Sequence, residues 1–107
     1  VSSNLISLML AQVSENKHLN AVFQDLLDAE GQEIYLKPMA DYVQTGTPID
    51  FYTVVESARR RGEVAIGRRI LAKAKDPKQQ YGIQVNPKKS EKVVYAEDDR
   101  LIVLAES

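Results

Sequence analysis

The sequence has no cysteine and no long apolar run. Without a thiol it can hold no disulfide, no thiol nucleophile and no zinc–thiolate site, and this composition fits a reducing compartment. No stretch of 18 apolar residues is present, so no membrane-spanning helix is predicted. The apolar stretch from Leu5 to Val13 has no basic region before it and no small-residue cleavage pattern after it, which argues against a signal peptide.

Phosphate-binding glycine motifs are also missing. The glycines at positions 31, 46, 62, 67 and 82 form neither G-x-G-x-x-G nor the P-loop pattern. His18 is the only histidine, and it has no partners at a spacing that suits a catalytic triad or a histidine metal site. We therefore expect His18 to be solvated and the chain to carry no cofactor site of its own.

The length and charge indicate one globular domain. The chain has 107 residues, of which 44% are hydrophobic and 27% charged, as in ordinary soluble domains. Its formal net charge of −1 gives no global field that would draw it to nucleic acid or to an anionic membrane. The chain begins at Val1 rather than Met, which suggests a fragment of something longer.

The first third of the chain predicts a helical hairpin. Apolar residues recur at helical spacing over residues 2–14 and again over 17–29, with a short polar break between them and Asn16 as the cap of the second helix. The apolar surface of this pair is large for a small domain, so two interpretations stay open: it packs on the local core, or it forms a dimer or inter-domain contact. The residues expected at such an interface are Leu5, Leu8, Met9, Leu19, Val22, Phe23 and Leu26.

The rest of the chain is organised around residues 49–70. Asp50 is placed to cap a helix that closes at Gly62 and leads into a strand over residues 63–70. Together with a strand at 33–37, this order favours a βαβ unit. Residues 71–92 predict a basic loop or extended hairpin with a short strand at 81–85, and the apolar run 101–105 predicts a fully buried strand.

These pieces predict an α+β fold. Its parts are a helix-turn-helix over residues 1–31 and a lobe with a small mixed β-sheet over residues 32–107.

Two charged clusters are candidate sites. The arginines at positions 59–61, 68 and 69 suit an anionic ligand or partner, with Arg61, Arg68 and Arg69 as the main candidates. The alternative is a structural role, because cations stabilise the last turn of a helix. Asp98 and Asp99, with Glu97, could bind a hard cation, although adjacent carboxylates before a strand are more often turn residues.

The order and spacing of these elements resemble a known family. The features are the strand Glu33–Lys37, a linker to Ile49-Asp50-Phe51, the helix ending at Arg61-Gly62, the strand Val64–Arg69, the Asn86-Pro87 loop and the segment Asp98–Ala105. They are similar to the C-terminal lobe of the regulator-of-K+-conductance domain, also called the TrkA-type C-terminal domain. Stretches that look like Arg59–Gly67 and Asn86-Pro87, after helices similar to Leu5–Ala11 and Leu19–Leu27, resemble the Castor and Pollux type of ion channel in particular.

The resemblance implies a cytosolic regulatory (gating) domain of a potassium or cation channel or transporter, at the cytoplasmic face of the membrane. Residues 1–31 would be the crossover hairpin through which two domains clasp each other, giving a homodimer or higher homo-oligomer. The lobe over residues 32–107 would dimerise or bind a small ligand or ion. A Rossmann-like lobe, which could bind an NAD-like nucleotide, and a transmembrane pore would precede this segment in the parent chain.

The residues also suggest two other classes of function. An enzyme acting on an anionic substrate is not favoured, because no nucleophile–base pair is visible. A small stand-alone module that binds a ligand or nucleic acid would use the helix-turn-helix and the lysines of 73–92. The polar face of the second helix carries Gln24, Asp25 and Asp28, which suits a phosphate backbone poorly, so no nucleic-acid partner is expected.

Overall fold

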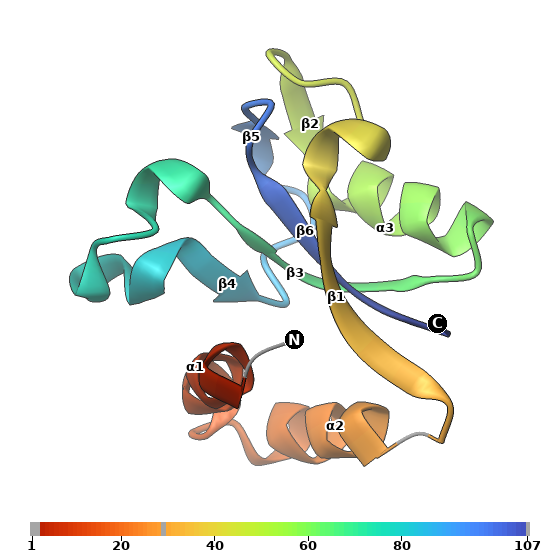
Figure 1. Ribbon diagram of the computed structural model, residues 1–107, viewed down its shortest axis with the longest axis vertical. Coiled ribbons are helices and arrows are strands. Elements are labelled where there is room, and N and C mark those ends of the chain that lie inside the picture. Colours follow the sequence, from red (N-terminus) through yellow and green to blue (C-terminus); the bar gives the residue numbers. More distant parts are fainter. Residues whose placement is uncertain (1–2, 29, 107) are drawn as a thin grey trace.

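The sheet of this protein lies between two helical layers (Figure 1). The computed structural model describes residues 3–28 and 30–106. Residues 1, 2, 29 and 107, which belong to the ends of some predicted segments, lie outside the described residues. The elements follow in this order: α1 (Ser3–Val13), α2 (Lys17–Asp28), β1 (Gln32–Pro38), η1 (Met39–Asp41), β2 (Pro48–Asp50), α3 (Phe51–Arg60), β3 (Val64–Arg69), η2 (Leu71–Lys73), η3 (Pro77–Gly82), β4 (Ile83–Val85), β5 (Lys92–Val94) and β6 (Arg100–Glu106).

The main sheet has the strand order β1-β6-β3-β4, and β2 and β5 form a separate two-stranded ribbon. Every neighbouring pair is antiparallel. The predicted α+β class is confirmed, but two details differ. The sheet is antiparallel rather than mixed, and the βαβ unit is split: β1 and β3 run parallel to each other, with β6 inserted between them.

The central position of β6 follows from its sequence. Residues 101–105 form a continuous apolar run, and each is at most 3% exposed. Ile102 and Leu104 belong to the core on the hairpin side of the sheet, while Leu101 and Val103 belong to the core on the α3 side. A strand that is apolar on both faces must lie inside a sheet with cover on both sides, as predicted.

The helical hairpin covers one face of the sheet. Asn16 caps α2 as predicted, because its Oδ1 accepts a hydrogen bond of 2.9 Å from the backbone N–H of Leu19. Met9 and Val13 of α1 and Phe23 of α2 are buried in the same core as Ile102. The hairpin therefore packs its main apolar face on its own sheet, and no described helix is long and apolar enough to cross a membrane.

Helix α3 covers the other face. Asp50 caps it through Oδ1, which accepts from the Thr53 N–H at 2.9 Å, and Gly62 closes it at a φ of +73°. Phe51, Val54 and Ala58, spaced as one helical face, are each at most 1% exposed. The predicted helix, its cap at Asp50 and its end at Gly62 are confirmed.

Strand β3 carries the one irregularity in the ladder. A register shift against β6 falls between Ala65 and Gly67, so Ile66 is an extra residue of a bulge. A Cβ at Gly67 would lie 2.6 Å from the carbonyl oxygen of Gln84. Glycine is therefore required here for β3 and β4 to pair.

The segment over residues 71–92 folds more tightly than predicted. It contains two short 3₁₀ helices, and β4 starts only at Ile83 because Gln80, Tyr81 and Gly82 all have positive φ values of 50°, 57° and 79°. Left-handed backbone cannot continue a strand. The short strand β2 was missed, because Pro48 and Asp50 read as turn and cap residues.

We expect Ile102→Ala to lower the free energy of unfolding by about 2–5 kcal/mol, because it opens a cavity against the hairpin. Val94→Ala is the matched control, since Val94 is also a branched residue of a strand but is 58% exposed. Urea denaturation followed by circular dichroism measures both. Equal losses in the two variants would contradict a core organised around β6.

Candidate functional site

The predicted arginine site is built around Arg68, which is only 3% exposed. Its Nε and Nη2 donate to Oε1 of Gln84 at 3.0 and 2.6 Å, and its Nη1 donates to the Tyr95 hydroxyl at 3.0 Å. Nη2 also lies 3.3 Å from a carboxylate oxygen of Glu91. The guanidinium sits near the rings of Phe51 and Tyr95, 6.0 and 5.9 Å from their centres. The buried Arg68 side chain thus links β3 to β4 and to Glu91 and Tyr95, the residues on either side of β5.

Arg61 and Arg69 contact different residues from Arg68. Arg61 lies over the ring of Tyr42, 4.3 Å from its centre, and donates to the backbone carbonyl of Asp41. Arg69 donates through Nε to the backbone carbonyl of Tyr81 at 3.1 Å. The three guanidinium groups therefore have three separate sets of partners, and an anion or interface role for any of them stays a prediction.

Glu63 forms a charged cluster that sequence reasoning did not identify. Its two carboxylate oxygens accept from Nζ of Lys37 at 2.6 Å and from the Tyr42 hydroxyl at 2.5 Å. Burial by itself would raise the pKa of Glu63, but the hydrogen bonds from Lys37 and Tyr42 and the charges of Lys37 and Arg61 hold it below its ordinary value. Burial, and then the hydrogen bond to Glu63, raises the pKa of the Tyr42 hydroxyl far above its ordinary value. The cluster joins β1, the start of β3 and the segment after η1.

The acidic turn before β6 is organised by Asp99, which is 3% exposed. Its carboxylate accepts from the backbone N–H groups of Leu71 and Ala96, at 2.9 and 2.8 Å. The arrangement is that of a turn residue, which was the alternative to a cation site. Glu97, Asp98 and His18 are exposed. Among the described residues, no group of three or more histidine or carboxylate side chains is placed to hold a metal ion.

The structure places the seven predicted interface residues in three environments. Leu5, Met9 and Phe23 are at most 4% exposed and belong to the chain's own core. Leu8, Leu19 and Leu26 are partly buried against that core. Val22 alone is exposed, at 42%. The dimer interface stays a prediction, and any partner on this helix would meet the outer side of α2.

A small apolar groove runs beside Val22, between α2 and β3. It has a volume of 140 Å³ and is lined by Leu19, Val22, Phe23, Leu26, Val64, Ala65, Ile66, Val85 and Asn86. Val64 on its far wall is 47% exposed. Two valines exposed on either side of one groove give this face an apolar character that isolated surface valines do not have.

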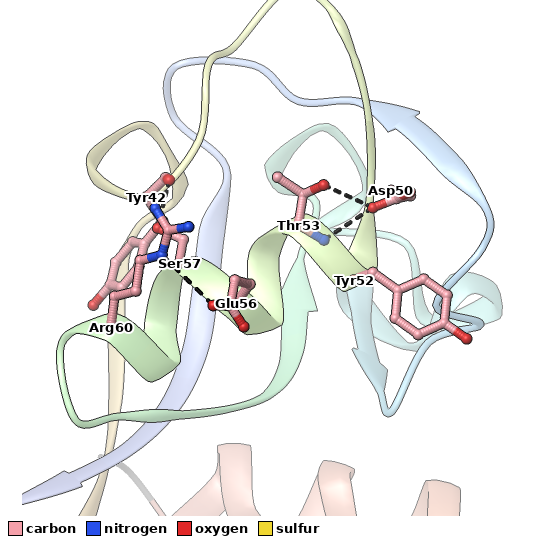
Figure 2. Close-up of a pocket in the computed structure, with 7 residues that line it drawn as sticks. All are labelled: Tyr42, Asp50, Tyr52, Thr53, Glu56, Ser57 and Arg60. Atoms are coloured by element: carbon pink, nitrogen blue, oxygen red, sulfur yellow. Dashed lines mark hydrogen bonds and ion pairs between the residues drawn. The ribbon is translucent and has the colours of Figure 1, made fainter.

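A second depression lies along α3 and is polar (Figure 2). It has a volume of 420 Å³, and its lining residues include Asp50, Glu56 and Arg60. Arg60 Nε lies 3.6 Å from Glu56, and Asp50 is bonded to the Thr53 hydroxyl at 2.8 Å. Tyr52 points away from the other labelled side chains. Two of its charged groups thus pair with each other, while Asp50 serves as the cap of α3.

The side chain of Gln12 makes a contact that was not predicted from the sequence. Its side-chain amide bonds the backbone of β4 at both Ile83 and Val85. One sequence signal could have predicted this contact: Gln12 is a polar residue within the apolar run 5–13. A buried or half-buried amide needs hydrogen-bond partners. Sequence reasoning likewise predicted no role for Tyr95, a buried residue whose hydroxyl accepts a hydrogen bond from Arg68.

Comparison with known proteins gives several plant ion channels. The chain is 31% identical over 108 aligned residues to "Probable ion channel POLLUX" of Arabidopsis thaliana, covering 100% of this chain and 12% of that protein. It is 35% identical to "Ion channel DMI1" of Medicago truncatula, covering 98% and 11%. It is 34% identical over 70 residues to "Ion channel CASTOR" of Lotus japonicus, covering 65% and 8%. The chain thus spans between 8% and 12% of the length of these relatives. No protein-family model matches the sequence.

We expect Arg68→Met to lower the free energy of unfolding by about 1–3 kcal/mol, because it leaves the hydroxyl of the buried Tyr95 without its hydrogen-bond partner. Arg60→Met is the matched control and should change little, since Arg60 is exposed on α3. Urea titrations of both variants measure the difference. An unchanged midpoint for Arg68→Met would show that the buried guanidinium is not a structural tie.

We expect the free energy of unfolding to fall as the pH drops below about 4.5, and Glu63→Gln to weaken that fall. The folded pKa of Glu63 lies below its unfolded value, so its contribution is fully present above the unfolded pKa. It is lost as the pH decreases through the folded pKa. Urea titrations between pH 7 and pH 3 measure this, with the exposed Glu30→Gln as control. Parallel pH curves for wild type and Glu63→Gln would count against the cluster.

Proposed function

We propose that this chain, which is homologous to one segment of the Castor and Pollux ion channels, is a regulatory lobe of such a channel. The lobe pairs with a second copy and transmits that pairing to a pore. The observation that carries the proposal is the similarity over the whole chain to one segment of those proteins. The α+β architecture fits the C-terminal lobe of a regulator-of-K+-conductance domain. The similarity supports a domain that is part of an ion channel, and a role of that domain in gating is our proposal.

The described residues support a role other than catalysis. The relatives are named ion channels. The two charged groups that are buried in the described part of the chain are hydrogen-bonded within the fold. Asp99 accepts two backbone N–H bonds, and Arg68 donates to the side chains of Gln84 and Tyr95. Buried groups that are satisfied in this way hold a fold together, whereas catalytic groups face a cavity that admits a substrate. We therefore propose a binding and coupling module.

The surface proposed for pairing is the groove between α2 and β3. Its exposed valines, Val22 and Val64, belong to the hairpin and to the sheet respectively, so a partner seated there would touch both layers. Apolar area that remains open after a core has formed favours association. Pairing of two copies across this face would link the hairpin of each copy to its sheet.

The remaining partners follow from the family resemblance. A Rossmann-like lobe and a transmembrane pore would belong to the parent chain, and an NAD-like nucleotide would bind that lobe rather than this segment. The lobe would lie at the cytoplasmic face of the membrane. A ligand or partner changes a gate only through contacts that differ between two states, so the proposed mechanism is a change of angle between paired lobes.

A stand-alone nucleic-acid module gains no support. The outer face of α2 carries Gln24, Asp25 and Asp28, all exposed, and carboxylates there repel a phosphate backbone.

We expect Val22→Glu with Val64→Glu to convert a dimer to a monomer, because two charges would be desolvated in the paired state. Both residues are exposed in the single chain, so the fold is retained. Multi-angle light scattering of the isolated chain measures the mass. The same double substitution in the parent channel is then tested for altered open probability in patch-clamp recordings.

Val94→Glu is the matched control, since Val94 is more exposed than either valine but lies on β5, outside the groove. It should leave both mass and open probability unchanged. A wild-type chain that stays monomeric at high micromolar concentration would contradict the proposal that two copies pair through this groove. An unchanged open probability in the doubly substituted channel would contradict the proposed gating role.

A further inference from the structure

A groove lies between α1 and the segment that runs from η2 to β4. Its volume is 790 Å³, within the range of roughly 300–1,000 Å³ that is usual for binding clefts. Leu8, Ala11 and Gln12 form one wall, and Lys73, Lys78 and Gln80 lie among the residues of the other. This groove shares Val85 with the α2–β3 surface but contains neither of that surface's exposed valines, Val22 and Val64.

The floor of the groove is the outer edge of β4. On its inner side β4 pairs with β3, and Gly82 and Asn86 continue that pairing at its two ends through bonds to Ile70 and Ile66. The backbone groups of Ile83 and Val85 that face outward therefore lie on a sheet edge. An edge of this kind is a template for a further strand unless something covers it.

Gln12 covers this edge with a peptide-like group. Its side-chain amide donates through Nε2 to the Ile83 carbonyl at 2.5 Å and accepts through Oε1 from the Val85 N–H at 2.8 Å. In a parallel ladder, one residue of the neighbouring strand makes this same pair of bonds, to the C=O before and the N–H after the residue opposite it. The amide of Gln12 thus occupies the place of one residue of a parallel strand paired opposite Gln84.

The groove is basic. Lys73 and Lys78 line it, and among the described residues neither is in an ion pair. They belong to the segment 71–92, which carries six lysines against two carboxylates, although the whole chain has a net charge of −1. One of those carboxylates, Asp76, already accepts from the Lys78 N–H and the Gln79 amide. Local positive charge beside this strand edge favours a negatively charged partner.

The backbone of the lysine-bearing wall is held in a strained form. Gln80 and Tyr81 have φ values of 50° and 57°, a left-handed region that residues other than glycine rarely adopt. Gly82 follows at 79°, where a Cβ would meet the Ile70 carbonyl oxygen at 2.2 Å. Strain of this kind gathers at binding sites, where the fold maintains it for the sake of a surface shape.

We propose that this groove binds an extended acidic peptide, which adds to the sheet as a strand parallel to β4 and displaces the amide of Gln12. Backbone bonds to Ile83 and Val85 supply the pairing, and Lys73 and Lys78 select carboxylates on the peptide. Gln12 acts as a built-in competitor that keeps the edge closed when no peptide is present. The proposal does not depend on the channel assignment or on pairing of two copies.

The test uses the 107-residue chain and a short fluorescein-labelled peptide of alternating glutamate and valine, with fluorescence anisotropy as the readout. Lys73→Glu with Lys78→Glu should weaken binding by about tenfold or more, since two attractions become repulsions. Gln12→Ala should tighten binding by roughly two- to tenfold, the factor that matches the net free energy of one hydrogen bond. Amide NMR should show the Val85 N–H shifting when the peptide binds.

Matched controls separate this site from general charge effects. Lys75→Glu with Lys88→Glu makes the same charge change on lysines that do not line the groove, and Gln24→Ala removes an exposed glutamine of α2. Both should leave binding unchanged. A lysine–valine peptide that binds equally well, or a Gln12→Ala variant with unaltered affinity, would overturn the proposal. Self-association that Lys73→Glu with Lys78→Glu abolishes would replace the peptide by a second copy.

Discussion

The structure depends on burying β6 on both of its faces. This strand contributes alternate side chains to two separate cores, one under the hairpin and one under α3. The buried apolar residues of the hairpin and those of α3 belong to different cores, and the strands of the sheet contribute to both. The burial of an apolar strand inside a covered sheet therefore sets the layer order, the strand order and the position of every charged cluster around it.

Charged groups in this protein mainly close gaps at the edges of those cores. Arg68 lies on the α3 side, where it links β3 to β4 and to Tyr95. Asp99 fastens the turn before β6 to the segment after β3, and Glu63 fastens β3 to β1 and Tyr42. A buried ion contributes little unless its hydrogen bonds are complete, and these three are well bonded. The surfaces left for partners are consequently the less charged face at Val22 and the strand edge at Gln12.

Much of this fold could be predicted from the sequence because its strongest signals are local. The helix ends are predicted by residue type alone, at Asp50, Asn16 and Gly62. The central strand is predicted by the unbroken apolar run over residues 101–105. The insertion of β6 into the βαβ unit could not be read in this way, because strand order is decided by packing between segments far apart in the chain. The arginines show the same limit. Their spacing suggested one shared site, whereas the alternation of β3 and the end of α3 send Arg61, Arg68 and Arg69 to different partners.

The inserted position of β6 has a consequence for how the chain acquires its structure during synthesis. Strands β1 and β3 are made early, yet each pairs with β6, which spans residues 100–106. Until β6 leaves the ribosome, β1 and β3 lack the strand that pairs with both of them. The helical hairpin also lacks the β6 side chains on which it packs. Such sequence-distant pairing slows folding and exposes apolar surface meanwhile. Before residues 100–106 are synthesised, the apolar residues of the hairpin, β1 and β3 that pack on or pair with β6 therefore lack that partner.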